Sequence, residues 1–192
     1  MDTILKSERL SLAPLAASDL DLAIEMFTSP AVTRYAGGVM SPVDIGRELP
    51  TWTKRGGDGC IGVWSVSDRE TGEKYGSGCL LPMPIHESDT EWDRVIPGVM
   101  PDGDVEVGYF LKESAWGRGY ATEICRRLIR FAFESTDLDE VVATFDDDNA
   151  ASKRVLEKSG LSERGRRMAY GQDAPDWRIR RAEWVARVAE GG

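Results

Sequence analysis

A glycine-rich turn between an apolar run and an amphipathic segment constrains this chain more than any other feature. Residues 105–111 (VEVGYFL) form the β-branched and aromatic run that is typical of a strand. Gly117 and Gly119 follow, and from Ala121 onward apolar side chains recur with a helical period of about 3.6 residues. The sequence therefore predicts a strand, a tight turn and a helix in succession, with turn amides that no Cβ shields from a ligand.

The patterns on either side of this unit predict antiparallel hairpins before it and a second strand–helix pair after it. The expected strands are residues 10–13, 60–66, 75–81, 141–145, 164–170 and 177–183, the last two joined by a turn at 171–175. Further helices are expected from a cap at Ser18 or Asp19 to Pro30, over 45–54, and from Asn149 to Gly160. This order predicts an α+β fold with a mixed, mostly antiparallel sheet flanked by helices. We expect a single domain over residues 1–187 and a loose C-terminal tail over residues 188–192.

Length and charge exclude several classes of protein. A chain of 192 residues suits one compact domain. Its 24 Lys and Arg against 33 Asp and Glu give a formal net charge of -9, which repels nucleic acid and anionic membrane surfaces. No window approaches the length of a membrane-spanning apolar helix, and residues 1–6 lack the pattern of a secretory signal. We expect a cytoplasmic protein with no nucleic-acid or membrane partner.

The cysteines and the single histidine do not predict a metal site or a disulfide framework. Cys60, Cys79 and Cys125 lie far apart in the sequence, and His86 is the only histidine. Neither pattern matches the spacing of zinc ligands. We therefore expect free, buried thiols and no metal.

Three ligand interpretations of the glycine turn can be compared with a turn that binds nothing. A phosphate loop of nucleoside triphosphatases ends in G-K-[ST], whereas Gly119 is followed by Tyr120 and Ala121. A dinucleotide fold requires a third small residue, and Thr122 stands there instead. The pyrophosphate of coenzyme A and a ligand-free strand-to-helix turn both remain compatible with the residues.

Three segments in the same order resemble one known family. Residues 106–109 (EVGY), 116–123 (WGRGYATE) and 149–161 (NAASKRVLEKSGL) look like the GNAT N-acetyltransferase superfamily, and the opening residues 7–10 (SERL) are similar to its ribosomal-protein N-terminal alanine and serine acetyltransferase branch. The resemblance implies a GNAT-like single domain that uses acetyl-CoA as acetyl donor. The chain departs from the general pattern at Trp116, where Gln or Arg is usual.

The resemblance also implies which residues bind the cofactor. They are the strand residues Val107 and Tyr109, the turn and helix residues Trp116, Gly117, Arg118, Gly119, Tyr120, Ala121 and Thr122, and Asn149 beside the pantetheine arm. Backbone amides at the positive end of the helix would hold the pyrophosphate. A solvated side chain at Arg118 and a helix cap at Asn149 are the structural alternatives.

Glu106 and Ser152 are the candidate catalytic residues. An acceptor amine has to lose a proton before it attacks the thioester, and a buried carboxylate on the strand beside the thioester suits that task. The resemblance implies this role for Glu106, against a solvated carboxylate or an ion-pair partner as alternatives. Leu156 stands where many members carry a tyrosine acid, so the leaving-group role passes by resemblance to Ser152, which is also a typical capping residue.

The predicted function is acetyl transfer from acetyl-CoA to a primary amine, either a protein N-terminus or a small amine, by direct attack within a ternary complex. A non-catalytic acyl-CoA-binding sensor or interaction module is the alternative. The acidic segment 82–104 either lines the approach of a cationic amine or is a solvated loop. The resemblance is compatible with a homodimer.

Overall fold

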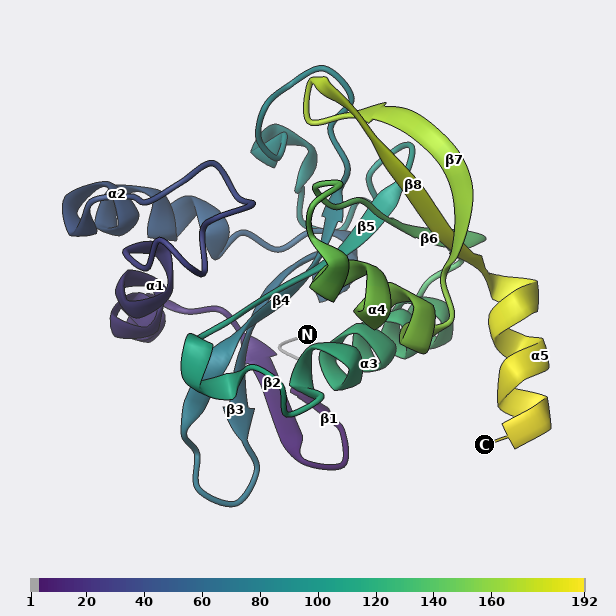
Figure 1. Ribbon diagram of the computed structural model, residues 1–192, viewed down its shortest axis with the longest axis horizontal. Helices are drawn as coiled ribbons and strands as arrows, with labels where there is room; N and C mark the ends of the chain where they lie inside the picture. The colour runs from purple at the N-terminus through teal and green to yellow at the C-terminus, as the bar shows by residue number, and fades with distance from the viewer. Residues whose placement is uncertain (1–3, 192) are drawn as a thin grey trace.

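The strands form one mixed sheet in the order β1-β2-β3-β4-β5-β6-β8-β7 (Figure 1). The computed structural model describes residues 4–191. The strands are β1 (Leu5–Lys6), β2 (Leu10–Pro14), β3 (Gly62–Asp68), β4 (Lys74–Pro82), β5 (Val105–Leu111), β6 (Glu140–Ala143), β7 (Ser162–Ala169) and β8 (Gln172–Arg180). The helices are α1 (Leu20–Phe27), α2 (Pro42–Trp52), α3 (Tyr120–Ser135), α4 (Ala150–Ser159) and α5 (Arg181–Gly191). The pairs are antiparallel except β5 with β6, so the expected mixed, mostly antiparallel α+β fold is confirmed.

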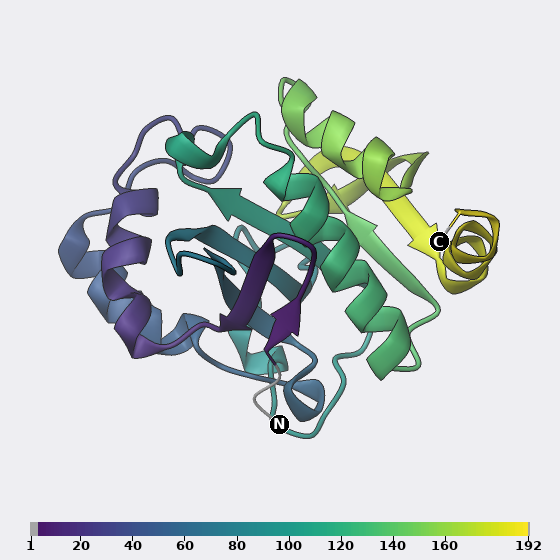
Figure 2. The same ribbon diagram turned by 90° about the horizontal axis from the view of Figure 1, so that it is seen from below.

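Helices cover the two faces of the sheet differently. The helices α3 and α4 lie side by side across one face, whereas α1 and α2 pack together beside the other end of the sheet (Figures 1 and 2). On β3, Trp64 is buried in the core with α3, while its neighbour Val63 also packs against the cluster of α1 and α2. Gly78 on β4 lets α3 approach closely, since a Cβ there would lie 2.6 Å from Ile124 Cγ2.

The parallel strands β5 and β6 diverge. Their described pairing consists of Glu106 opposite Val142, whereas β5 pairs with β4 along its whole length from Val105 to Leu111. Beyond Glu106, the β6 side of strand β5 therefore has no strand partner in residues 4–191. Peptide groups without a ladder partner are available for another hydrogen-bonding molecule.

The final hairpin differs from the sequence prediction. The turn consists of Tyr170 and Gly171 alone, both at positive φ, so that the expected turn 171–175 is wrong and Pro175 lies within β8 opposite Arg166. Proline is tolerated there because β6 pairs with β8 only from Trp177 onward, which leaves no ladder bond for an N–H at residue 175.

The C-terminal segment is helical where the sequence analysis expected a strand and a tail. Strand β8 ends at Arg180, whose N–H donates to Glu183 Oε2 at 2.9 Å, as expected at the start of a helix. Helix α5 then runs through Gly191, so residues 188–191 of the expected tail are part of it. It lies at the edge of the molecule beyond β8 in both views (Figures 1 and 2).

The first two helices begin differently from the prediction. Asp19 precedes α1, but its carboxylate accepts from the Ala16 amide and the Lys74 ammonium rather than capping the helix. Helix α2 begins three residues before the expected Ile45, because the Ser41 hydroxyl accepts from the Asp44 amide.

The cysteines and the helix lengths can be compared with the sequence predictions. All three cysteines are free, and Cys125 is buried, but Cys60 and Cys79 are only partly so. No helix in residues 4–191 has the length and apolar character needed to cross a bilayer.

Candidate active site

The glycine turn has the backbone geometry predicted for it. Gly117 and Gly119 adopt φ values of 72° and 81°, a region that side chains with a Cβ rarely occupy. A Cβ built on Gly117 meets no atom within 4 Å, so the space beside the turn is open. Helix α3 begins directly after Gly119, and its first amides have no partner within the helix. The turn therefore joins an open surface to the positive end of a helix dipole.

The other predicted turn residues differ in what their side chains do. Trp116 is exposed, and its indole N–H donates to the Leu111 carbonyl at 2.8 Å. Tyr120 is buried and stacks on Tyr75, with ring centroids 5.0 Å apart, while Ala121 and Thr122 are half-buried. A ligand at the turn would therefore meet backbone amides at residues 120–122 rather than the Tyr120 ring.

The Arg118 side chain is not simply solvated. Its guanidinium lies 4.7 Å from the centroid of the Tyr120 ring and 5.2 Å from that of Tyr75. Cation–π contacts of this kind stabilise an exposed site by about 0.5–1 kcal/mol. The side chain thus packs along two tyrosine rings, beside the turn that it belongs to.

The N-terminal hairpin holds the start of α3. The Glu123 carboxylate accepts from the Ser7 hydroxyl at 2.8 Å, from the Arg9 amide at 2.7 Å and from the Arg9 guanidinium at 2.8 Å. Arg9 also donates to the Arg118 carbonyl inside the turn at 3.0 Å. Residues 7–10, which the sequence linked to the site only by family resemblance, therefore hold the glycine turn in place through hydrogen bonds.

Tyr109 of β5 and Ser152 of α4 lie next to each other. Tyr109 Oη lies 3.4 Å from Ser152 Oγ, on the face covered by α3 and α4. Burial raises the pKa of the Tyr109 phenol, so this group stays protonated. The neighbouring strand residue Val107 has its side chain in the core, and only its backbone can reach a ligand in the opening. The side-chain oxygen Oδ1 of Asn149 accepts from the Ser152 amide at 3.1 Å and caps α4, as the structural alternative for this residue expects.

Glu106 is buried at the point where β5 and β6 diverge. It is 7% exposed, so the alternative of a solvated carboxylate is wrong. Burial raises its pKa from 4.5 to about 7, although a hydrogen bond from Tyr170 and the charge of Arg167 oppose that rise. A carboxyl group with this pKa exchanges a proton near neutral pH. Glu106 faces away from Tyr109, because alternate residues of a strand point to opposite faces.

Tyr170 is a site residue that the sequence did not predict. Its hydroxyl donates to Glu106 Oε1 from the turn between β7 and β8. No local pattern connects a turn tyrosine with a strand residue 64 positions earlier. The available signal was the Tyr-Gly dipeptide, since two-residue hairpin turns favour a glycine at this position.

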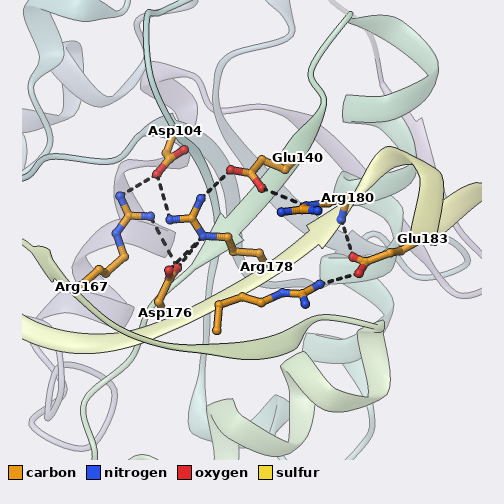
Figure 3. A network of polar contacts seen from close by, with 8 residues as sticks. Asp104, Glu140, Arg167, Asp176, Arg178, Arg180 and Glu183 are labelled. Carbon is orange, nitrogen blue, oxygen red and sulfur yellow. Dashed lines mark hydrogen bonds and ion pairs between the residues drawn. The ribbon is translucent and has the colours of Figure 1, made fainter.

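A network of ion pairs links neighbouring strands of the sheet (Figure 3). Arg167 pairs with Asp104 at 2.6 Å, and Arg178 pairs with Asp176 at 2.9 Å and with Glu140 at 2.5 Å. Because these residues come from β6, β7, β8 and the residue before β5, the network ties three strands to the entry of a fourth. Of its members, Arg167 also lowers the pKa of Glu106.

The acidic segment 82–104 is only partly available to a cationic acceptor. Glu91 pairs with Arg94, and Asp104 pairs with Arg167. Asp89 is exposed, and its charge raises the pKa of Glu106, so it lies within electrostatic range of that carboxyl. Of these three acids, Asp89 is therefore the one that an approaching cationic amine could meet. Within residues 4–191, no group of three or more metal-ligating side chains is found.

Comparison with known proteins decides the family. The family described as "Acetyltransferase (GNAT) domain" matches residues 9–162 of this chain. The chain belongs to the GNAT acetyltransferase family. The Bacillus anthracis GNAT-family acetyltransferase superimposes with a TM-score of 0.73 at 17% identity, covering 94% of this chain and 99% of that one. The predicted GNAT fold and N-acetyltransferase class are confirmed.

Two further relatives carry names that describe their reactions. The "FsC-acetyl coenzyme A-N(2)-transacetylase" of Aspergillus fumigatus is 28% identical over 159 residues, which are 82% of this chain and 64% of that protein. The structure described as RimL, a ribosomal L7/L12 alpha-N-protein acetyltransferase in complex with coenzyme A, has a TM-score of 0.67 at 15% identity. It covers 93% of this chain and 98% of that one. Members of this family of acetyltransferases use acetyl-CoA as the donor.

Proposed function

We propose that this GNAT enzyme transfers the acetyl group of acetyl-CoA directly to a primary amine, with Glu106 as general base and Ser152 as proton donor to the thiolate. One observation carries the proposal. The buried Glu106 carboxyl, with its pKa of about 7, lies where β5 and β6 separate, on the strand that leads into the glycine turn.

The donor would bind along the opening between the two strands. Its diphosphate fits the open side of the turn, where Gly117 leaves space and the amides of residues 119–122 point outward from the start of α3. Its pantetheine arm would lie beside β5 and hydrogen-bond to backbone groups that have no strand partner. The Asn149 side chain, already the cap of α4, stands at the far side of this opening.

Glu106 would remove a proton from the acceptor. An alkylammonium has a pKa of about 10, so nearly all acceptor is protonated at neutral pH and cannot attack. When the Glu106 carboxylate takes that proton, directly or through one water molecule, the nitrogen lone pair is free. Because the pKa of Glu106 is about 7, half of the carboxyl groups are in the basic form at neutral pH.

The transfer itself would pass through a tetrahedral intermediate. The amine nitrogen bonds to the acetyl carbon, and an amide of Val107 or Gly108 donates to the oxygen that gains negative charge. The nitrogen then gives up its second proton to water, the C–S bond breaks, and the thiolate takes a proton from Ser152 Oγ. Tyr109 Oη, 3.4 Å from Ser152 Oγ, can pass a proton from water to that oxygen and so stays protonated itself.

The acceptor is proposed to be a cationic primary amine, either a protein N-terminus or a small molecule. Asp89 and Glu106 give the approach a negative field. One relative is named as an N(2)-transacetylase and one structural neighbour as an alpha-N-protein acetyltransferase, so both names describe transfer to nitrogen.

The test is release of the CoA thiol from acetyl-CoA in the presence of candidate amines. We expect release with at least one amine in a panel of N-terminal peptides, polyamines and aminoglycosides. Mass spectrometry should find one acetyl group on the product amine and none on the enzyme. Saturable acetyl-CoA binding without thiol release across the panel would instead identify a non-catalytic sensor.

A further inference from the structure

Tyr170 adopts an unusual backbone conformation. Its φ is 52°, and among residues 4–191 only Asp58 shares a positive φ without being glycine. A bulky side chain in this region costs about 1–2 kcal/mol relative to an extended or helical conformation. A conformation of this cost persists only where surrounding contacts enforce it, and such residues concentrate at functional sites.

The turn that carries Tyr170 is docked on the segment after β4. The Tyr170 amide donates to the Pro84 carbonyl at 3.2 Å, and the Gly171 amide donates to the Ile85 carbonyl at 3.0 Å. Gly171 is required for this approach, because a Cβ there would lie 3.0 Å from the His86 carbonyl oxygen. In Figure 1 the turn between β7 and β8 lies at the top of the view, beside this segment.

Docking directs the Tyr170 ring over Glu106. The ring packs on a small apolar cluster of Met83, Val142 and Ala169, and its hydroxyl donates to Glu106 Oε1. Val142 is also the residue that pairs with Glu106 where β5 and β6 diverge. The phenol thus covers the carboxyl on the face of the sheet opposite α3 and α4.

Few charged groups face Glu106, and they come from several elements. Arg167 of β7 lowers the pKa of Glu106 and Asp89 of the 82–104 segment raises it. On β4, burial and then the Glu106 charge raise the pKa of Cys79, which keeps this thiol neutral. Asp104, which precedes β5, pairs with Arg167 at 2.6 Å. The Tyr170 hydroxyl is therefore the hydrogen-bond donor that contacts the carboxyl directly.

We propose that Tyr170 is a positioning residue, which holds the Glu106 carboxylate ready for the acceptor. This inference rests on the proposed role of Glu106 and adds the group that controls it. The hydrogen bond favours the ionised form, so Tyr170 keeps more of the base active than burial alone would allow. The other lone pairs of the carboxylate, those of Oε2 above all, stay available to accept from a cationic amine.

The test is Tyr170→Phe, which keeps the ring, its packing and the backbone conformation but removes the donor. Loss of a hydrogen bond to a charged group raises the Glu106 pKa by about one unit above its value of about 7. The acid limb of the kcat/KM profile should then move up by about one unit. Turnover should fall about tenfold near pH 6 and approach the wild-type value near pH 9.

A titration that needs no turnover accompanies the kinetics. In protein labelled with 13C at the glutamate carboxyl, the Glu106 resonance is the one missing from the Glu106→Gln spectrum. We expect its midpoint to rise by about one pH unit in Tyr170→Phe. Gln172→Ala, an exposed neighbour on the same hairpin, is the matched control and should leave the midpoint unchanged.

The two readouts separate this inference from the proposed function. An unshifted Glu106 titration in Tyr170→Phe overturns the role of Tyr170, whether or not the enzyme is active. A shifted titration with a shifted acid limb supports it. A shifted titration in a protein that acetylates none of the amines overturns the proposed reaction but leaves the Tyr170–Glu106 coupling in place.

Discussion

Burial makes Glu106 suitable for proton transfer, and the same burial opposes folding when the carboxyl is charged. The folded pKa of about 7 exceeds the value of about 4.3 for an exposed glutamate. A group with a raised folded pKa stabilises the native state below the unfolded pKa and loses that contribution as pH rises through the folded pKa. The enzyme is therefore expected to be less stable at the pH values where the Glu106 carboxyl is ionised.

Glu106→Gln should lower kcat/KM by about 10²- to 10³-fold, because a general base typically contributes that much. The residual rate should lose the acid limb centred near pH 7, while the dissociation constant for acetyl-CoA stays within about twofold. Rate profiles from about pH 5.5 to 9.5 and calorimetric titration with acetyl-CoA measure both. An unaltered profile would remove Glu106 from the reaction.

The same variant should be more stable than wild type at high pH. The substituted amide carries no charge to desolvate, so the melting temperature of Glu106→Gln should exceed that of wild type by a few degrees at about pH 8.5, and by less at about pH 5. Thermal unfolding at the two pH values measures the difference. An equal rise in melting temperature at both pH values would mean that the buried charge of Glu106 does not cause the difference in stability.

Ser152→Ala should lower kcat about 10- to 100-fold with little change in the KM for either substrate, because the hydroxyl is proposed to act only as the thiolate leaves. The helix should remain intact, since the cap of α4 is the Asn149 side chain. Steady-state kinetics and thermal unfolding separate the two roles. A large fall in melting temperature with normal kcat would mean that Ser152 is structural.

At the level of elements, the strand–turn–helix unit was predicted most accurately. Strand β5 has the predicted bounds, 105–111, because valine and aromatic residues dominate it and polar or turn residues flank it. The β7–β8 hairpin was only partly predicted, since Pro175 gives a turn signal that tertiary pairing overrides. Helix α5 was missed because a charged start and a glycine-rich end hid its apolar positions.

Some features of the candidate site could be predicted from local sequence and others could not. The turn glycines and the strand position of Glu106 follow from local sequence. The burial of Glu106 and its contact with Tyr170 depend on segments more than 60 residues apart, which no periodicity encodes.

Gly117→Ala tests the turn, and Gly72→Ala is its matched control. Both glycines have similar φ values, 72° and 75°, and a Cβ at either meets no atom within 4 Å. Each substitution should therefore cost about 1 kcal/mol of stability through backbone strain. Only Gly117→Ala should raise the KM for acetyl-CoA, by about tenfold or more, because its Cβ enters the space proposed for the diphosphate. Equal KM values in the two variants would place the diphosphate elsewhere.

Across the whole molecule, the N-terminal hairpin and α3 are joined through one carboxylate. Partial burial raises the pKa of Glu123, but the hydrogen bonds from Arg9 and Ser7 outweigh this and the net pKa is lowered. A depressed folded pKa stabilises the native state above the unfolded pKa, and that contribution is lost as pH falls through the folded pKa. The contact between the N-terminal hairpin and α3 should therefore weaken only in acid, below about pH 4.

Glu123→Gln should destabilise the protein by about 1–3 kcal/mol at neutral pH, because its amide nitrogen cannot accept from Arg9. It should also raise the KM for acetyl-CoA several-fold, since Arg9 bonds the Arg118 carbonyl inside the turn. Urea unfolding and initial rates measure these effects. Glu134→Gln, which removes an exposed pair with Arg130 on the same helix, should cost less than about 0.5 kcal/mol.

The separation of β5 from β6 beyond Val142 has a consequence for how such enzymes diversify. Main-chain atoms of a strand and a turn line the side proposed for the thioester, whereas two surface segments, 82–104 and the β7–β8 turn, cover the opposite side. Surface segments tolerate insertion and replacement far better than a paired strand does. The preference for an acceptor amine can therefore change when those two surface segments are replaced, while the strand and turn proposed to bind the thioester stay the same.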